Sequence, residues 1–304
     1  MIQRIIADSL ALKVAQVERI IASASHSYYH FQIPKRNGGL RDIYHPSQKL
    51  KLLQRWVTKA LLTRLPVSSA AAAYEEGSSI VRNARMHVAN RFLLRLDFAN
   101  FFPSLTGDDV KRLLTTNRTL VSDFVADDRD LDVVRRITCR FGSLTIGAPS
   151  SPVLSNRIME PFDTFCLLEA NARGMVYTRY ADDLFFSCGE PNVLQEVPAM
   201  IERRLGLMDR SRLRLNAGKT IHSSKKGRRV VTGLRLTSED RVSLGREFKR
   251  SLRTKVHLAT QGSLPPTEIG TLRGLLAFAK DVEPDLLIRL RVKYGTEAVD
   301  AILG

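Results

Sequence analysis

The chain has 304 residues, of which 44% are hydrophobic, and this is enough for a sizeable core divided among two or three sub-domains. Its mean hydropathy is −0.13 and no apolar run approaches the ~20 residues that span a bilayer, so the composition excludes a membrane helix. The N-terminus mixes charge with apolar residues and lacks the apolar core of a signal peptide, so we expect a cytoplasmic protein with no membrane partner.

The charge of the chain is strongly positive. Its 47 Lys and Arg exceed its 31 Asp and Glu by 16, and residues 201–255 alone hold 17 basic and 5 acidic residues. A polyanion, above all a nucleic acid, is the natural partner. The alternatives are a solubilising basic face and, less favoured, an anionic membrane surface. Three scattered cysteines, Cys139, Cys166 and Cys188, fit neither a disulfide framework nor a zinc site.

The first third of the chain alternates helical and strand patterns. Amphipathic spacing predicts one or two helices in residues 1–25. Residues 28–46 read as two strands around the turn Asn37-Gly38-Gly39, where glycine supplies positive φ. A strong amphipathic helix follows over 49–65, and a short helix or turn over 78–89.

The remainder combines a few strands with many helices. We expect a strand over 91–98, helices over 106–140, 151–170 and 192–206, short strands over 212–216, 219–223 and 228–236, and helices from about 245 with a linker at 262–268. Ser151 is the expected N-cap of its helix, with Pro152 at the first position.

Two adjacent acids lie inside an apolar run. In VYTRYADDLFFS, Asp182 and Asp183 separate two segments that read as hairpin strands. Neighbouring residues on a strand point to opposite faces, so one acid can point at a site while the other flanks it. Asp97 ends another apolar strand. Carboxylates gathered in this way repel one another unless cations separate them, and two Mg²⁺ ions about 3.5–4 Å apart would satisfy them and support nucleotidyl transfer.

A second Ala-Asp-Asp serves as an internal control. Asp127 and Asp128 lie among other charges with no apolar strand after them, and they read as a solvated helix start. The alternative for Asp182 and Asp183 is an exposed β-turn, where Asp is common.

These residues belong to a longer series of blocks that resembles the reverse transcriptases. The blocks, in order, are IPKRNGGLRDIYHP with LKLLQRWV, then AYEEGSSIVRNARMH, LDFANFFPSL, GAPSSPVLSN, YTRYADDLFFS, LNAGKT and VTGLRL. Two short features resemble the bacterial retron branch: Asn83 to His87 matches Asn-Ala-x-x-His, and Val231-Thr232-Gly233 matches Val-Thr-Gly. Their structural alternatives are a capped helix with a packed histidine and a strand with a bulge glycine.

The resemblance implies an α+β right-hand polymerase fold. Residues 1–90 would form N-terminal helices and fingers, residues 91–238 an antiparallel palm with a helical insertion at about 106–142, and residues 239–304 a helical thumb. Asp97, Asp182 and Asp183 would be catalytic and would hold two Mg²⁺ ions, with the Phe98 carbonyl completing the site.

The resemblance also implies the substrate contacts. Arg41 is the preferred contact of the dNTP γ-phosphate, and Phe102 would exclude a ribose 2′-hydroxyl. The other predicted dNTP contacts are Lys35, Arg36, Gly147, Ala148 and Lys219, and the predicted nucleic-acid contacts are Asn83, His87, Val231, Thr232, Gly233, Lys249, Arg250, Arg253 and Lys255. Ile146 departs from the family, which usually has Gln there, and this puts nucleotide affinity and accuracy in doubt.

Retron enzymes copy their own structured non-coding RNA, beginning DNA from the 2′-hydroxyl of a guanosine, and make branched RNA–DNA called msDNA in defence against phage. We therefore expect that RNA, its msDNA product, dNTPs and a separately encoded effector as partners. The alternatives are another bacterial reverse transcriptase (group II intron-like or protein-primed), an RNA/DNA-binding scaffold that restrains an effector, and, less favoured, another palm-fold enzyme such as a nucleotide cyclase.

Overall fold

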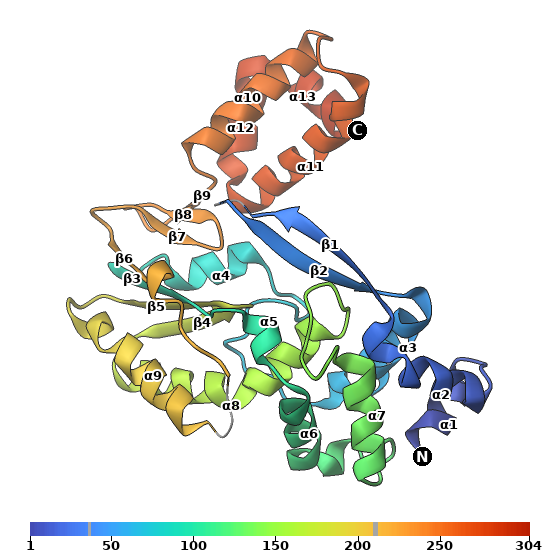
Figure 1. Cartoon of the computed structure of the whole chain (residues 1–304). Helices are drawn as coiled ribbons and strands as arrows, with labels where there is room; N and C mark the ends of the chain where they lie inside the picture. Colours follow the sequence, from blue (N-terminus) through green and yellow to red (C-terminus); the bar gives the residue numbers. More distant parts are fainter. Residues whose placement is uncertain (36–37, 209–211) are drawn as a thin grey trace.

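The computed structural model describes residues 1–35, 38–208 and 212–304. Figure 1 shows helices at the base, a sheet in the middle and a helical group at the top, with a long hairpin on one side. The N-terminal region consists of α1 (Ile2–Ser9), α2 (Val14–Ala22), η1 (Ala24–His26), β1 (Tyr28–Pro34), β2 (Leu40–Pro46), α3 (Gln48–Ala60), η2 (Leu62–Arg64) and α4 (Ile80–His87). The hairpin turn predicted at Asn37 lies outside the described residues, while Gly38 and Gly39 have the expected positive φ.

The middle region holds a four-stranded antiparallel sheet in the order β4-β5-β3-β6. Its elements are β3 (Phe92–Asp97), α5 (Phe101–Ser104), α6 (Gly107–Thr116), η3 (Arg118–Leu120), α7 (Asp128–Thr138), α8 (Ser151–Ala172), β4 (Val176–Tyr180), β5 (Asp183–Cys188), η4 (Val193–Gln195), α9 (Val197–Leu207), η5 (Ala217–Lys219) and β6 (Ile221–Ser224). Asp127 caps α7 by accepting hydrogen bonds from the main-chain N–H groups of Arg129 and Asp130, which confirms the helix start predicted there.

Two local predictions were wrong. The N-cap of α8 is Ser150, with Ser151 as the first helical residue and Pro152 the second, because a turn from Ala148 to Ser151 begins the winding one residue earlier. Of the strand predicted over 212–216, only a single antiparallel bridge between Leu215 and Phe98 is present, because the segment pairs with the residues that follow β3 and not with the strand itself.

The two faces of the middle sheet belong to different cores. Leu94 and Leu96 of β3, with Leu184 and Phe186 of β5, join the core on the side that α8 and α9 cover (Figure 1). Alternation along the strands sends Leu93 and Phe185 to the other face, where they pack with α4 and the C-terminal region. Arg95, Asp97 and Asp183 continue that second face beyond its apolar part.

The C-terminal region begins with a small sheet and ends in helices. It comprises β7 (Arg229–Val231), β8 (Leu234–Leu236), β9 (Val242–Ser243), α10 (Arg246–Thr260), α11 (Pro266–Val282), α12 (Pro284–Tyr294) and α13 (Thr296–Leu303). Because β9 pairs with β8, the sheet crosses the predicted palm–thumb limit at 238. No helix in the described part of the chain has both the length and the apolar character needed to cross a membrane.

Candidate active site

The acidic turn connects β4 to β5. Tyr180 pairs with Asp183, which leaves Ala181 and Asp182 as a two-residue loop. Ala181 has φ +56°, a value that costs free energy for a residue other than glycine and is found where the surroundings enforce it. The main-chain N–H of Phe98 donates to the Asp182 carbonyl at 3.0 Å, which joins the loop to the end of β3.

A buried ion pair supports this loop from below. Arg179 of β4 and Asp163 of α8 are both fully buried, and the shortest distance between their charged groups is 2.6 Å. Arg179 Nη1 also donates to the Ala181 carbonyl at 3.1 Å and to Asn156 Oδ1 at 3.2 Å. Tyr177 donates its hydroxyl to Asp163 at 2.8 Å. The network therefore holds the strained residue immediately before Asp182.

The three predicted acids gather at one end of the sheet. Asp97 and Asp183 are direct partners across β3 and β5, and Asp182 lies in the adjoining loop. Burial raises the pKa of Asp182, and the charge of Asp97 raises it further. Burial also raises the pKa of Asp183 to about 6, against the opposing effect of Arg95. Negative charge is therefore costly here and needs a cation.

Arg95 supplies one such cation, and the sequence reasoning missed it. Its Nε and Nη2 lie 3.0 and 2.8 Å from Asp183 Oδ1, and Nη2 lies 3.0 Å from Oδ2. The pattern RLD offered a signal, since residues two apart on a strand share a face. Because Arg95 engages both oxygens, Asp183 is not presented as a free ligand, and its role in metal binding stays a prediction.

Lys219 supplies the second cation. Its ammonium lies 2.9 Å from each oxygen of Asp97, while its side chain is 52% exposed and free to move toward solvent. Asn216 adds a main-chain hydrogen bond to the Asp97 carbonyl at 2.8 Å. The LNAGKT segment thus lies at the acids, as the resemblance implied, although Lys219 contacts a carboxylate in this structure.

The acids fit a divalent cation only in part. Over residues 1–35, 38–208 and 212–304, no three His, Cys, Asp or Glu side chains converge as metal ligands. Asp97, which is buried, and Asp182, which is partly buried, remain as a carboxylate pair, and burial and then the charge of Asp97 raise the pKa of Asp182. Oxygen ligands in small number suit Mg²⁺, which keeps several waters or substrate oxygens. The carboxylates of Asp97 and Asp182 are therefore suitable ligands for Mg²⁺.

Two residues of the N-terminal region face the acids. Burial raises the pKa of Asp182, and the charge of Arg41 on β2 is among the effects that oppose this rise, which indicates that its guanidinium lies toward the site. Tyr74 is half-exposed with φ +67°, and burial and then the charge of Asp182 raise the pKa of its phenol. Tyr74 was missed as a site residue, although it belongs to the AYEEGSS block. Lys35 is exposed, and Arg36 lies outside the described residues.

Three predicted dNTP contacts, Phe102, Gly147 and Ala148, lie in the middle of the chain. Phe102 is half-buried at the edge of the core, beside the buried Phe101, and its contact with the sugar stays a prediction. Gly147 has φ +111°, and a Cβ on it would lie 2.8 Å from the Tyr44 carbonyl, so its main chain approaches β2 closely. Ala148 is buried, and the approach of its main chain to the nucleotide stays a prediction.

The Asn-Ala-x-x-His segment is structural. Asn83 and His87 of α4 are fully buried. His87 bonds through Nδ1 to Ser187 at 2.7 Å and through Nε2 to Thr178 at 2.8 Å, and Thr178 donates to Asn83 Oδ1 at 2.6 Å. The prediction that these two side chains contact nucleic acid is wrong, because both are enclosed between α4 and the sheet.

The Val-Thr-Gly segment packs against the same helix. Thr232 (φ +48°) and Gly233 (φ +86°) form the two-residue turn between β7 and β8, with the positive φ at both positions that a type I′ turn requires. The Thr232 hydroxyl donates to the Ile80 carbonyl at 3.0 Å, and Val231 is buried. Val231 therefore cannot contact nucleic acid directly, which corrects that prediction.

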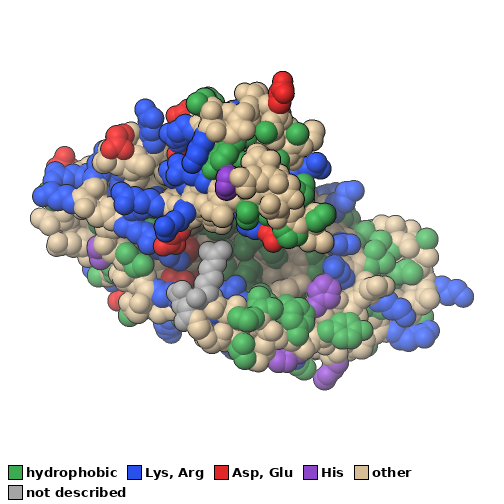
Figure 2. Space-filling model, turned by 90° about the horizontal axis from the view of Figure 1, so that it is seen from above, with side chains coloured by type: hydrophobic (Ala, Val, Ile, Leu, Met, Phe, Trp, Pro, Cys, Tyr) green, Lys and Arg blue, Asp and Glu red, His purple; other side chains and the backbone are tan. Residues whose placement is uncertain are grey.

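The basic residues of α10 lie on more than one face. Lys249 pairs with Glu283 at 3.0 Å and Lys255 pairs with Glu268, so both are partly neutralised. Arg250 and Arg253 are exposed and line a cavity of about 640 Å³ between α10 and α12. The other residues of this cavity are Arg246, Lys249, Arg289 and Glu283. Figure 2, seen from the side of these helices, shows a central hollow with Lys and Arg side chains dense on one side.

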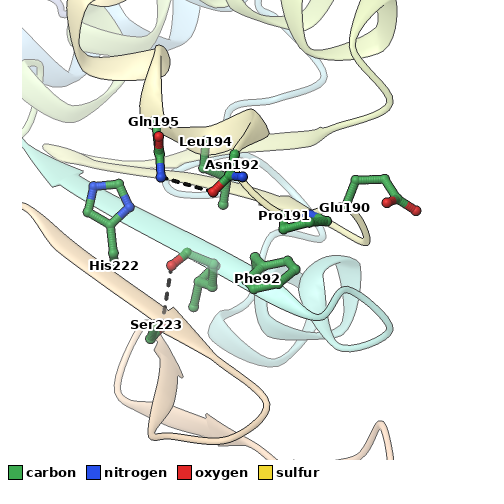
Figure 3. Close-up of a pocket in the computed structure, with 9 residues that line it drawn as sticks. Phe92, Glu190, Pro191, Asn192, Leu194, Gln195, His222 and Ser223 are labelled. Atoms are coloured by element: carbon green, nitrogen blue, oxygen red, sulfur yellow. Dashed lines mark hydrogen bonds between the residues drawn. The ribbon is translucent and has the colours of Figure 1, made fainter.

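A further pocket lies at the edge of the sheet, apart from the acids. It has a volume of about 370 Å³ and lies between β6 and the segment Glu190 to Gln195 (Figure 3). Phe92 and Pro191 contribute apolar surface, and His222 and Gln195 contribute polar groups. None of the predicted site residues is among the described residues that line it.

Comparison with known proteins agrees with this arrangement. Residues 33–238 match the family model for the reverse transcriptase (RNA-dependent DNA polymerase). The chain is 36% identical over 286 residues to the retron Ec83 reverse transcriptase of Escherichia coli, covering 92% of this chain and 90% of that protein. It is 32% identical over 299 residues to the retron Ec86 reverse transcriptase of Escherichia coli, covering 93% and 88%.

Solved structures give weaker similarities. Apo telomerase from Candida tropicalis has a TM-score of 0.49 at 11% identity, covering 90% of this chain and 57% of the other. The foamy viral protease-reverse transcriptase has a TM-score of 0.45 at 17% identity, covering 91% and 44%. The sequence relationship carries the assignment: the chain belongs to the reverse transcriptases, in their retron branch, with their polymerase fold, and is an RNA-directed DNA polymerase.

Proposed function

We propose that the protein copies its own structured non-coding RNA into DNA that remains branched from that RNA. Synthesis would begin at the 2′-hydroxyl of a guanosine and yield msDNA, in the cytoplasm, as part of antiphage defence with a separately encoded effector. The observation that carries the proposal is the 36% identity to the retron Ec83 enzyme over nine-tenths of both chains.

Asp97 and Asp182 would hold the metal ions, with the Phe98 carbonyl as a further oxygen ligand. When bound, Mg²⁺ would activate the attacking hydroxyl and neutralise charge on the phosphates. The Arg179–Asp163 pair keeps the Asp182 loop in place, so the carboxylate is positioned before substrate arrives. Arg95 holds Asp183 beside them.

The charged side chains around the acids suit a nucleoside triphosphate. Arg41 and Lys35 on the β1–β2 hairpin would bind its phosphates, and a guanidinium suits a phosphate because it can donate two parallel hydrogen bonds. The Lys219 ammonium would leave Asp97, bind the phosphates of the nucleotide and donate a proton to the leaving group. Phe102 would lie against the sugar and exclude a 2′-hydroxyl.

The C-terminal helices would hold the duplex of RNA template and DNA product. Arg250 and Arg253 are exposed on one face of α10, and Glu283 is the one acid among the six described residues that line the neighbouring cavity. Such a surface suits phosphate oxygens, and binding through it should weaken steeply with salt. A-form duplexes are recognised by shape and 2′-hydroxyls more than by base edges.

The test is to express the protein with its flanking DNA and to analyse the nucleic acid that co-purifies. DNA whose mobility changes on RNase treatment, and which is absent with Asp182→Asn, supports the proposal. RNA without DNA in both samples favours the binding scaffold. DNA that resists RNase but shifts with protease points to protein priming and contradicts the proposal.

A further inference from the structure

A cluster of rings and a guanidinium lies on the outer side of the β1–β2 hairpin. The rings of His30 and Tyr44 are stacked, with centroids 4.7 Å apart and planes 18° apart. Arg140 lies over Tyr44 at 4.0 Å and over Phe141 at 4.7 Å. His26 contacts the Phe141 ring edge-on, with centroids 5.2 Å apart. Three segments distant in sequence thus build one continuous stack.

Phe141 holds an unfavourable position within this cluster. Arg140 and Ser143 exchange main-chain hydrogen bonds of 2.9 and 3.1 Å, so Phe141 and Gly142 are the centre of a two-residue turn. Both have positive φ, 46° and 81°, as in a type I′ turn, where Asn followed by Gly is preferred. A bulky ring in this conformation costs free energy. Its side chain is also 60% exposed.

Folding alone therefore does not account for Phe141. Its backbone is strained, its ring contributes little buried area, and its main-chain N–H donates to Ser25 Oγ at 3.3 Å. Strain retained in an exposed aromatic side chain points to a binding role. His30, at one end of the stack, and Phe141 are both exposed, so a further planar group can stack on either ring.

The charge of the cluster favours an anionic partner. Among the described residues, no carboxylate forms an ion pair with Arg140, whose guanidinium lies over the rings of Tyr44 and Phe141. Asp42 is the acid of this surface, and it is engaged by His30 at 2.7 Å and Gln32 at 2.9 Å. Rings alternating with cations suit unpaired nucleotides, whose bases stack while the phosphates meet the charges.

The position of the cluster separates it from the nucleotide site. Arg41 and Tyr44 occupy opposite faces of β2, because side chains alternate along a strand. Arg41 shares its face with Ile43, whose Cγ2 would lie 3.1 Å from a Cβ on Gly147, so Tyr44 and its stack lie on the other face of the hairpin. The hydrogen bond from Tyr44 N–H to the Ile146 carbonyl at 2.8 Å, beside Gly147, fixes this face against the loop that leads into α8.

We propose that the stack formed by His26, His30, Tyr44, Arg140 and Phe141 binds unpaired template RNA before it reaches the acids. A polymerase that copies RNA must hold single-stranded template ahead of its active site. Bases within a duplex are already stacked on each other, so a free ring face selects the unpaired strand. The inference rests on membership in the reverse transcriptases and stands or falls independently of guanosine priming.

The test compares two template–primer duplexes, one blunt and one with a 5′ RNA overhang of about ten nucleotides, within the site sizes of single-strand binders. Affinity is measured by fluorescence anisotropy without dNTP. We expect the wild type to bind the overhang duplex more tightly than the blunt one. Phe141→Asn should bind the overhang duplex about fivefold or more weakly than the wild type does, while its affinity for the blunt duplex stays unchanged. Arg140→Gln should reduce the salt dependence of that binding.

The Phe141→Asn variant separates binding from folding. Asn suits the turn better than Phe, so its melting temperature should equal or exceed that of the wild type. Phe141→Tyr keeps a ring and should bind as the wild type does. Leu168→Ala removes another exposed apolar side chain, on α8, and should leave the affinities for the blunt and the overhang duplex unchanged. Unchanged overhang binding by Phe141→Asn, or an equal loss on the blunt duplex, would overturn the proposal.

Discussion

Lys219 donates to both carboxylate oxygens of Asp97, each at 2.9 Å. The lysine is half-exposed while the aspartate is almost fully buried, so the mobile partner is the cation. A metal ion ligated by Asp97 has to compete with this ammonium, and the displaced ammonium is then free for the phosphates of the nucleotide. We therefore expect the pair to couple metal binding at Asp97 to the release of Lys219 toward the nucleotide.

Replacing this lysine should produce two separable effects. Lys219→Met should lower the rate of dNTP incorporation by about a hundredfold, the lower range for loss of a general acid. It should also lower the Mg²⁺ concentration for half-maximal rate, because Asp97 loses a competing cation. Both are measured by primer extension over a Mg²⁺ titration. Lys226→Met, at an exposed position of the same region, is the control, and an unchanged Mg²⁺ dependence in Lys219→Met would contradict the coupling.

Gly147 should tolerate no side chain. A Cβ there would meet the Tyr44 carbonyl at 2.8 Å in a backbone of φ +111°, so Gly147→Ala should destabilise the protein by about 1–3 kcal/mol and raise the KM for dNTP. Thermal unfolding and primer extension measure the two effects. Gly274→Ala is the matched control: it lies in α11 with open space around the added Cβ and should stabilise by about 0.5–1 kcal/mol. Similar melting temperatures for the two variants would refute this account.

His87 should make stability depend on pH. Burial lowers the pKa of its imidazole to about 3, below the unfolded value of 6.5, so the folded state binds fewer protons. Its stabilising contribution is complete above pH 6.5 and is lost as pH falls toward 3, by about 1.4 kcal/mol per pH unit. His87→Gln does not titrate. It should be less stable at pH 7, yet lose about 2 kcal/mol less than the wild type between pH 7 and pH 5 in urea unfolding. Parallel losses would exclude His87 as the titrating group.

The acidic turn was predictable because its signal is local. Two aspartates between apolar strands, and a third at the end of another strand, specify a site wherever the strands pair. The contacts that hold the turn were not predictable in this way. Arg179 and Asp163 lie on different elements, and no local pattern distinguishes a buried arginine from a solvated one. Arg95 could have been predicted from the sequence, because it shares a face of β3 with Asp97.

The errors concern burial. Asn83 and His87 occur in a polar stretch of the chain that suggests a surface, yet the sheet and α4 enclose them. Polar side chains can be buried when they satisfy one another, and Ser187 and Thr178, about a hundred residues away, provide the partners. Phe141 shows the opposite case, an aromatic residue that composition assigns to the core and the turn geometry keeps outside.

The most direct test of the account is DNA synthesis without an added primer. The purified protein, its non-coding RNA, labelled dNTPs and Mg²⁺ are incubated, and the products are separated on a denaturing gel before and after treatment with a 2′,5′-debranching enzyme. The account predicts labelled DNA attached to the RNA, released by debranching and absent with Asp182→Asn. Labelled DNA that debranching leaves unchanged, or synthesis only when a DNA primer is supplied, would contradict it.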